Sequence, residues 1–495
     1  MMWKKVYSLV VVVSILVIVQ GCEDTVPPGE QLARKTCSSC HKYPAPGELD
    51  KNTWMKYVLP QMGGFLGFRL FEGGTYFEDD RIERSISIDD WNTIVQFYIA
   101  TAPAKISTAE RTHSISGKIP FFETYRFPYR KSESATTFIA IDSTHRLLFG
   151  DGVSSRLYRA NSTLTGIEDS ISAGTGLADV LADSSGMYLL SMGVLTPSDA
   201  LKGKLMHAKS FSGNATVLID SLQRPVDFSY MDLNSDGRKD FVICEFGNTS
   251  GSLAWYEHLS SGAFTKHTLR PLPGAVHTEI ADFNKDGLPD IIALMAQGDE
   301  GMFIYYNLGQ NQFKESRILQ FSPAYGSNSF QLYDFNKDGH PDIVASNGDN
   351  GDYPPILKPY HGLRIYINDG NNRFSEEVFI HVDGASKVIA ADFDNDGNAD
   401  LASIAYFADY ENHPEESFVL WKNSGDFEFS GYSFPEVNAG RWLTMDANDI
   451  DGDGDMDIVL GNANFSMGKI PPNLKEEWNR TAPSVIVLKN SARRR

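Results

Sequence analysis

Cysteine is scarce in this chain. Only 4 of its 495 residues are cysteine, which is too few for a fold held together by a disulfide framework. Cys244 lies in an apolar run, where we expect a buried small side chain rather than a reactive thiol. The other three cysteines lie near the N-terminus in two separate motifs.

Signatures of common enzyme classes are also absent. The chain has no GxSxG nucleophile motif, no HExxH zinc motif and no glycine-rich phosphate loop. The sequence therefore offers little support for a hydrolase or a nucleotide-dependent enzyme.

Positive charge is in deficit, since 44 lysines and arginines face 64 aspartates and glutamates, a net charge of −20. This balance disfavours nucleic acid as a partner. Because 18 aspartates fall in five short loops, these loops alone hold nearly as many negative charges as the net excess of 20, which therefore requires no cationic partner. The length predicts two units, and 42 glycines with 12% aromatic residues indicate a turn-rich β protein.

The acidic loops share one nine-residue frame, which begins at Asp232, Asp282, Asp334, Asp392 and Asp449. Oxygen-bearing side chains at positions 1, 3, 5 and 9 surround a glycine at position 6, and position 7 adds its backbone carbonyl, as in calcium loops. A short apolar β run follows each frame, whereas an EF-hand loop leads into a helix and ends on a glutamate at position 12, so EF-hands are excluded.

We predict about five bound Ca²⁺ ions, with the loops at Asp392 and Asp449 binding most tightly because they hold most carboxylates. The predicted ligand positions are Asp232, Asn234, Asp236, Arg238, Asp240, Asp282, Asn284, Asp286, Leu288, Asp290, Asp334, Asn336, Asp338, His340, Asp342, Asp392, Asp394, Asp396, Asn398, Asp400, Asp449, Asp451, Asp453, Asp455 and Asp457.

The frames begin 50, 52, 58 and 57 residues apart, the period of a four-stranded propeller blade. Together with the strand and turn pattern between them, they resemble the FG-GAP or VCBS repeats of integrin-like propellers over roughly residues 119–490. Two weaker copies, at Asp142 and Asp183, raise the expected number of blades to seven. The last copy lacks an outer strand, which we expect from Phe121–Phe127.

The N-terminus has Lys4 and Lys5 before an apolar run over 6–19, and then Cys22. The run is shorter than the roughly 20 residues needed to cross a bilayer, and the small residue before Cys22 resembles the lipobox of bacterial lipoproteins. We expect cleavage before Cys22, its acylation, and export to the periplasm, outer membrane or cell surface. An ordinary signal peptide with an incidental cysteine is the alternative.

Cys37, Cys40 and His41 form the C-x-x-C-H pattern of c-type haem attachment, in which two thiols bind the haem vinyl groups and the histidine ligates the iron. The competing interpretations are a zinc site, which lacks a second ligand pair nearby, and a redox dithiol, which does not need the histidine. We predict one covalent haem c.

The surroundings resemble a small class I cytochrome c domain over about residues 28–103. Met62, after a proline in a glycine-rich segment read as a turn, is the predicted sixth ligand. Met55 is expected to be a core residue, and a five-coordinate or water-ligated iron stays open. The expected organisation is a signal peptide over 1–21, the haem domain over 22–103, a linker over 104–118 and the propeller over 119–495. The fold class is thus an all-β seven-bladed propeller with a small all-α N-terminal domain.

Long insertions in the last three blades are expected on the face opposite the calcium loops. They carry a mixture of polar and aromatic residues suited to saccharides or protein surfaces, although ordinary loop packing explains them equally well. The candidate ligand-face residues are Tyr353, Tyr360, His361, Tyr410, His413, Trp478 and Arg480.

These features predict a lipid-anchored c-type cytochrome for electron transfer, whose propeller docks a redox partner, an extracellular protein or a glycan. One alternative is a cell-surface adhesion or glycan-binding module with a secondary haem domain. Another is a haem-linked oxidoreductase with a substrate site on the propeller. An electron carrier or binding protein is favoured over a catalyst.

Overall fold

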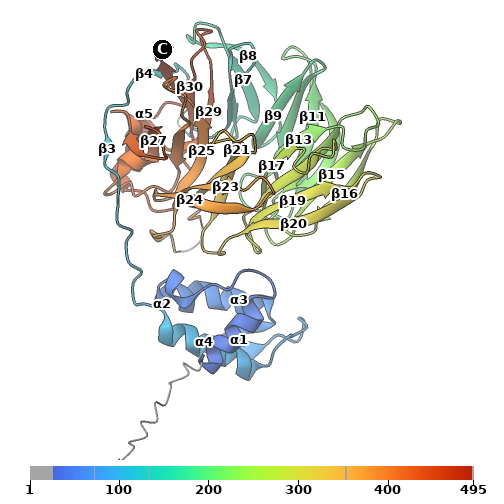
Figure 1. Ribbon diagram of the computed structural model, residues 1–495, viewed down its shortest axis with the longest axis vertical. Coiled ribbons are helices and arrows are strands. Elements are labelled where there is room, and N and C mark those ends of the chain that lie inside the picture. Colours follow the sequence, from blue (N-terminus) through green and yellow to red (C-terminus); the bar gives the residue numbers. More distant parts are fainter. Residues whose placement is uncertain (1–25, 72, 132, 352–353, 466, 493–495) are drawn as a thin grey trace, which may run out of the picture.

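The computed structural model describes residues 26–492, except 72, 132, 352–353 and 466. The predicted signal peptide, Cys22 and Tyr353 lie outside the described residues. A small helical unit lies against one side of a large β-propeller, and the segment between them runs along the edge of the propeller (Figure 1). Among the described residues, no helix is both long enough and apolar enough to cross a membrane.

The helical unit packs around two tryptophans, Trp54 and Trp91, which are both almost fully buried. Its elements are α1 (Pro28–Cys37), α2 (Lys51–Thr53), α3 (Leu59–Phe65), α4 (Ile88–Thr101) and a hairpin of β1 (Phe68–Leu70) and β2 (Tyr76–Glu78). Helix α1 crosses α4 closely, since a Cβ at Gly29 would lie 2.5 Å from Cβ of Phe97. One face of α4 is buried, as its helical spacing predicts.

Seven sheets, each with four antiparallel strands, form the blades, and in six of them the four strands follow one another in chain order, which confirms the predicted blade number. They are β5–β8 (Thr136–Ile141, Leu147–Asp151, Arg156–Ala160, Ile167–Ser172), β9–β12 (Leu177–Asp183, Gly186–Ser191, Leu201–Ala208, Thr216–Gln223), β13–β16 (Pro225–Met231, Asp240–Glu245, Ser252–His258, Phe264–Arg270), β17–β20 (Ala275–Ala281, Asp290–Met295, Gly301–Asn307, Phe313–Gln320), β21–β24 (Ser327–Tyr333, Asp342–Asn347, Gly362–Asn368, Phe374–His381), β25–β28 (Ala385–Ala391, Asp400–Ala405, Phe418–Asn423, Phe429–Tyr432), and β29–β31 (Trp442–Asn448, Asp457–Asn462, Val485–Asn490) with β4 (Phe122–Arg126).

The apolar core lies between neighbouring blades. Every residue of the second strand is buried in the last five blades, because the sheets on both sides cover it. This explains why these strands read as continuous apolar runs rather than alternating ones. The outer strands are more exposed, as the pattern of β24 shows.

The propeller closes with a strand from its N-terminal end. Strand β4 pairs antiparallel with β31, placing Tyr125 opposite Val487. The expected origin of the missing outer strand is confirmed, and the pairing covers the outer edge of β31.

The segment between the two units is anchored to the propeller. Its strand β3 (Ile115–Ser116) adds to blade β25–β28 as a fifth, parallel strand. Arg111 forms ion pairs of 2.7 Å with both Asp383 and Glu416, two almost fully buried carboxylates that require a cation. The predicted linker is therefore fixed along much of its length.

The helical unit contacts loops opposite the acidic frames. Ser322, between β20 and β21, donates a hydrogen bond of 2.6 Å to the Glu48 carboxylate. Tyr360, between β22 and β23, donates one of 2.7 Å to the Glu48 carbonyl. Ile356 packs against the core of the helical unit. The insertion face is thus partly covered by the chain's own N-terminal unit.

Candidate functional sites

The five acidic frames connect the first and second strands of the last five blades. In the frame at Asp334, its carboxylate accepts hydrogen bonds from the N–H groups of Asp338 (3.1 Å) and Gly339 (2.9 Å). Gly339 adopts φ +84°, a conformation that favours glycine. The loop therefore turns tightly around its own carboxylates.

The aspartate at position 9 has a role that its sequence position does not reveal. Asp342 is fully buried, and its two oxygens accept N–H donors from Phe335 (2.9 Å) and from Asn368 on the third strand (2.8 Å). The same pair of bonds recurs in all five frames. Position 9 thus ties the loop to the sheet, besides offering oxygen to a cation.

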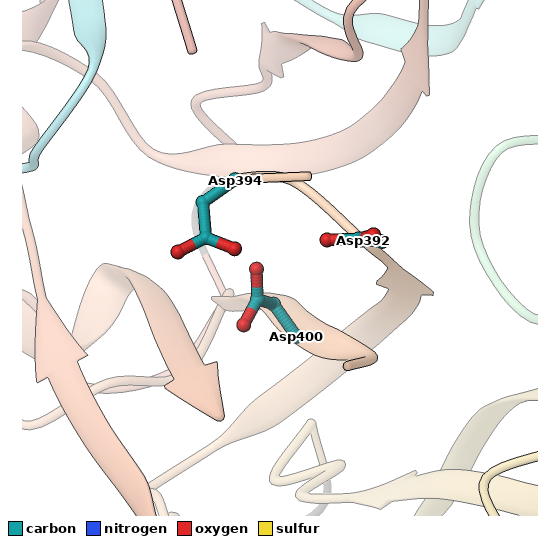
Figure 2. A group of neighbouring side chains, drawn as sticks. All are labelled: Asp392, Asp394 and Asp400. Carbon is teal, nitrogen blue, oxygen red and sulfur yellow. The ribbon is translucent and has the colours of Figure 1, made fainter. Parts of the chain in front are cut away.

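Two frames bring carboxylate oxygens within 4.8 Å of one another. Figure 2 shows the first group, Asp392, Asp394 and Asp400, whose carboxylates face a common point. The second group is Asp449, Asp451 and Asp453. Both are hard oxygen ligand sets of the kind that Ca²⁺ prefers.

The protonation behaviour of these loops also fits a cation. Burial, followed by repulsion from Asp394 and Asp396, raises the pKa of Asp400 to about 7. Burial, followed by Asp453, raises the pKa of Asp455 to about 7. Oδ1 of Asp455 is buried and accepts no hydrogen bond from the described residues. A bound cation would offset this repulsion and give that oxygen a partner.

A side chain on the third strand faces position 3 of the loop. The Lys422 ammonium contacts the Asp394 carboxylate and lies 3.8 Å from that of Asp396, and Lys489 lies 3.6 Å from Asp451. In the frame at Asp232, by contrast, Asn234 donates a hydrogen bond of 3.3 Å to Glu257.

In these three frames lysine faces aspartate and glutamate faces asparagine, whereas the equivalent residues beside Asn284 and Asn336 are the uncharged Tyr306 and Ile367. The sequence prediction of calcium affinity did not include these facing residues. They could have been found by aligning the residue that precedes the last residue of each third strand.

The C-x-x-C-H motif begins at the last residue of α1. The N–H groups of Cys40 and His41 both donate to the Cys37 carbonyl at 3.3 Å, so the chain turns directly after the helix. Nδ1 of His41 lies 2.9 Å from the carbonyl of Lys42. Because a carbonyl can only accept, Nδ1 carries the proton and Nε2 is free to bind a metal.

Two features of this motif bear on the competing interpretations, a redox dithiol and a zinc site. Burial raises the pKa of the Cys37 thiol to about 11, whereas a reactive dithiol requires a lowered pKa. Within the described ranges, only the two aspartate groups bring three or more ligand atoms close enough for one ion, so Cys37, Cys40 and His41 do not form a zinc cluster.

Two buried donors of the helical unit, Oη of Tyr43 and Nε1 of Trp91, have no partner among the described residues. Haem propionates could accept from such donors.

The two methionines differ from their predicted settings. Met62 lies within α3 rather than in a turn, because the helical backbone continues from α2 through a π-helical segment (Trp54–Val58) into α3, and the wider π turn lies just before Pro60. It packs against the core of the helical unit. Met55 is 41% exposed and is therefore not a core residue, contrary to expectation.

The predicted ligand-face residues are mostly occupied by internal packing. His361, Tyr410 and Trp478 are buried, and the last two rings pack edge to face at 5.2 Å. Tyr360 is bound to Glu48. His413 is half-buried beside Glu415, and Arg480 is exposed on α5 (Pro472–Thr481). These aromatic residues thus support the face rather than present themselves to a ligand.

Comparisons with known proteins agree with this geometry. A model described as an FG-GAP-like repeat matches residues 232–293, 282–345 and 356–403, which include four of the five frames. The chain therefore carries FG-GAP-like repeats in a seven-bladed propeller, an architecture that suggests a binding or adhesion module.

Cartilage acidic protein 1 of Xenopus tropicalis is 31% identical over 168 residues, which cover 31% of this chain and 24% of that protein. The chain thus spans about a quarter of the length of this curated relative. A streptogramin B lyase structure covers 75% of this chain and 98% of its own, with 11% identity and a TM-score of 0.48. A protein from Lactobacillus plantarum covers 61% and 86%, with 14% identity and a TM-score of 0.40. The fold assignment rests on the strand topology of the chain itself.

Proposed function

We propose that the protein is an exported, lipid-anchored c-type cytochrome that transfers electrons, with its haem-bearing helical unit seated on a calcium-stabilised propeller that docks a protein or glycan partner. The observation that carries this proposal is the C-x-x-C-H turn at the end of α1, with the Nε2 of His41 free for iron. In an exported chain, this pattern favours haem attachment over a zinc site or a redox dithiol.

The residues present fit one haem c. Cys37 and Cys40 would hold it covalently, His41 would ligate the iron, and Met62 is the proposed second axial ligand. The bound group would supply one-electron chemistry. The hydrogen bond from His41 Nδ1 to the Lys42 carbonyl orients the imidazole, as outer-shell partners of metal-bound histidines do.

The contacts between the helical unit and the propeller support this proposal. Glu48 and the anchored segment at Arg111 hold the helical unit on the propeller. A partner bound on the insertion loops would therefore lie beside the haem-bearing unit. Such a fixed geometry favours transfer because no search by the helical unit is needed.

Covalent haem is the direct test. Protein matured in a host competent for haem attachment should gain the mass of one haem and show a c-type reduced α-band. Cys37→Ala with Cys40→Ala should abolish both. A mature wild-type protein without covalent haem would sink the proposal. Met62→Ala should convert a low-spin spectrum to high-spin, while the exposed Met55→Ala serves as the matched control.

The lipid anchor has its own test. Cys22→Ser should move the protein from the membrane fraction to the soluble fraction, because acyl chains on Cys22 supply the attachment. Retention in the membrane fraction would show that another element anchors the protein.

A second function, adhesion or ligand binding without electron transfer, is favoured by the FG-GAP-like repeats. The variant His41→Ala distinguishes electron transfer from adhesion or ligand binding. Partner binding that is unchanged, together with no reduction of the wild-type protein by a cytochrome partner, would favour the binding module. Rapid reduction that is lost in the variant would favour the cytochrome.

A further inference from the structure

The inner strands of the seven blades surround a lumen that water reaches. Strands β5, β9, β13, β17, β21, β25 and β29 follow one another around the axis, each packed against the next. On β17, the side chains of His277 and Glu279 are 33% and 30% exposed, although the second strand of the blade covers the outer edge of β17. The side chains at the centre of the propeller are therefore accessible to a small ligand.

The third residue of each inner strand belongs to one ring around this lumen. The pairing with the second strand shifts register just before this residue in every blade, as at a β-bulge, which re-aims the side chain. Six members of the ring are polar and partly exposed, and the seventh is apolar. The six are Asp179, Asp227, His277, Ser329, Lys387 and Thr444. Both acids lie at least three blades from the lysine, on the opposite side of the lumen.

Most polar members of the ring bond to the neighbouring inner strand. The Asp227 carboxylate accepts hydrogen bonds from Nδ1 of His277 (2.8 Å) and from the N–H of Thr278 (2.9 Å). In the same way, Oγ of Ser329 accepts from the N–H of Val388 at 3.3 Å. These side chains thus join one blade to the next and are largely satisfied by the fold itself.

Asp179 and Lys387 depart from this pattern. The Asp179 carboxylate accepts only from the N–H of the next residue, Val180, at 2.8 Å. Among the described residues, neither Asp179 nor Lys387 has an ion-pair partner. Burial, followed by repulsion from Asp227, raises the pKa of Asp179 to about 7, although Lys387 opposes the shift. One anion and one cation therefore face the same lumen without pairing with each other.

The charges around the lumen exclude the simplest ligands. In the described part of the chain, only the two aspartate loops group three ligand atoms closely enough for one ion, so the ring offers no metal site of this kind. A simple anion would be repelled by Asp227 and by Glu279 and Asp446, which lie two residues further along their inner strands. A simple cation would be repelled by Lys387. A ligand with both charges meets an opposite charge at each end.

We propose that the lumen binds a small zwitterion of the amino-acid class, with its ammonium group at Asp179 and its carboxylate at Lys387. The inference goes beyond the proposed function, because it adds a small-molecule site inside the propeller. It requires neither the haem nor the lipid anchor. The spacing between Asp179 and Lys387 would select the number of carbons between the two charges of the ligand.

The test is calorimetric titration of the full mature chain at pH 8, where Asp179 is ionised. The probes are the protein α-amino acids, β-alanine, 4-aminobutanoate and 6-aminohexanoate, which differ in charge separation. At least one should bind. Acetate and methylamine carry one charge each and should bind at least about tenfold more weakly, because one counter-charge is left without a partner.

Two variants test the residues. Asp179→Asn and Lys387→Met should each weaken binding of the zwitterion about tenfold or more. Asp220→Asn on β12 and Lys314→Met on β20 make the same changes at exposed outer-strand positions and should bind as wild type. A measurement on the wild-type protein guards against folding defects. Because Nε2 of His277 lies at the same ring, the bound zwitterion should shift the imidazole resonance of His277, which His277→Gln assigns.

The inference is overturned if no zwitterion binds, if acetate or methylamine binds as tightly, if Asp179→Asn or Lys387→Met binds as wild type, or if the His277 resonance does not move. A visible spectrum of the same sample reports the haem separately. Zwitterion binding without haem would overturn only the cytochrome, and haem without zwitterion binding would overturn only this inference.

Discussion

The first two blades and the last five make the same connection between their first and second strands in different ways. In the first blade, the carboxylate of Asp142 accepts hydrogen bonds from the N–H and hydroxyl of Thr144 (2.8 and 2.6 Å) and from the N–H of Arg146. In the second, Asp183 accepts from Ser185 and pairs with Lys239 at 2.9 Å. One carboxylate is thus satisfied by its own turn and needs no cation.

The last five blades hold three to five carboxylates in each nine-residue frame, more negative charge than the loop's own N–H groups neutralise. The propeller fold therefore accommodates either connection. We therefore expect the stability of the five blades with aspartate frames to depend on a cation, and that of the two blades with short turns not to.

The largest expected effect is that of calcium removal. A chelator should lower the unfolding temperature, because each ion that binds only the native state contributes about 2.7 kcal/mol at one hundred times its dissociation constant. Hydrogen exchange should rise at the five frames but not at the turns of Asp142 and Asp183. Identical melting curves with and without chelator would mean that the frames are empty turns and that the comparison has no basis in metal binding.

The second effect separates the two roles of the aspartates within one frame. Asp342→Ala should destabilise the protein by about 2–5 kcal/mol even in chelator, because two buried N–H groups lose their acceptor. Asp338→Ala, at the exposed position 5, should destabilise it only when calcium is present. Urea unfolding of both variants with and without chelator measures this. If each variant lost the same free energy of unfolding in calcium and in chelator, position 5 and position 9 would not have the separate roles inferred here.

Much of this architecture could be predicted because it depends on repetition. The five repeated frames and the two weaker copies predicted seven blades. The incomplete last copy predicted that strand β4 is donated from the N-terminal side. Both predictions depend only on the order of strands along the chain. The setting of Met62 was missed because Pro60 and Gly63 suggest a turn locally, yet Gly63 packs under the Trp91 ring, where its Cβ would lie 3.1 Å from the ring. Tertiary packing overrode the local signal.

The burial of Tyr410 and Trp478 and the docking of Glu48 were also beyond the sequence. Glu48 meets Ser322 and Tyr360, which follow it by 274 and 312 residues. No local pattern encodes such contacts.

The third effect concerns pH in the absence of calcium. Burial and neighbouring carboxylates raise the pKa of Asp400 to about 7 and that of Asp457 to about 6. A carboxyl group with a raised folded-state pKa contributes stability that is present below its unfolded pKa of about 4 and is lost as pH rises through the folded value. The chelated protein should therefore melt at a higher temperature at pH 5 than at pH 8.

The short turn of the second blade shows the opposite pKa shift, which supplies the internal contrast. Although burial opposes the shift, the Ser185 hydroxyl and Lys239 hold the pKa of Asp183 at about 2. Asp183 is therefore ionised throughout pH 5 to 8, and its titration causes no loss of stability in that range. Asp400→Asn should flatten the pH dependence of the chelated protein, whereas Asp183→Asn should leave its slope unchanged. A slope that survives Asp400→Asn would assign the effect to other groups.

The smallest effect tests the charge facing position 3. Lys422 neutralises Asp394, so this loop offers a cation less negative charge than its four aspartates suggest. Lys422→Met should raise the calcium affinity of this loop about tenfold, since an opposing charge a few ångströms away contributes roughly 1 kcal/mol or more near a surface. Lys489→Met, facing Asp451 at 3.6 Å, should have a smaller effect because that pair is more exposed.

Calcium titration of Lys422→Met alone and combined with Asp392→Ala assigns the change to this loop, because the gain should vanish in the double variant. If Lys422→Met instead lowers stability in chelator and leaves calcium affinity unchanged, the lysine serves as a structural partner of the sheet, and carboxylate count alone sets the affinity of each frame.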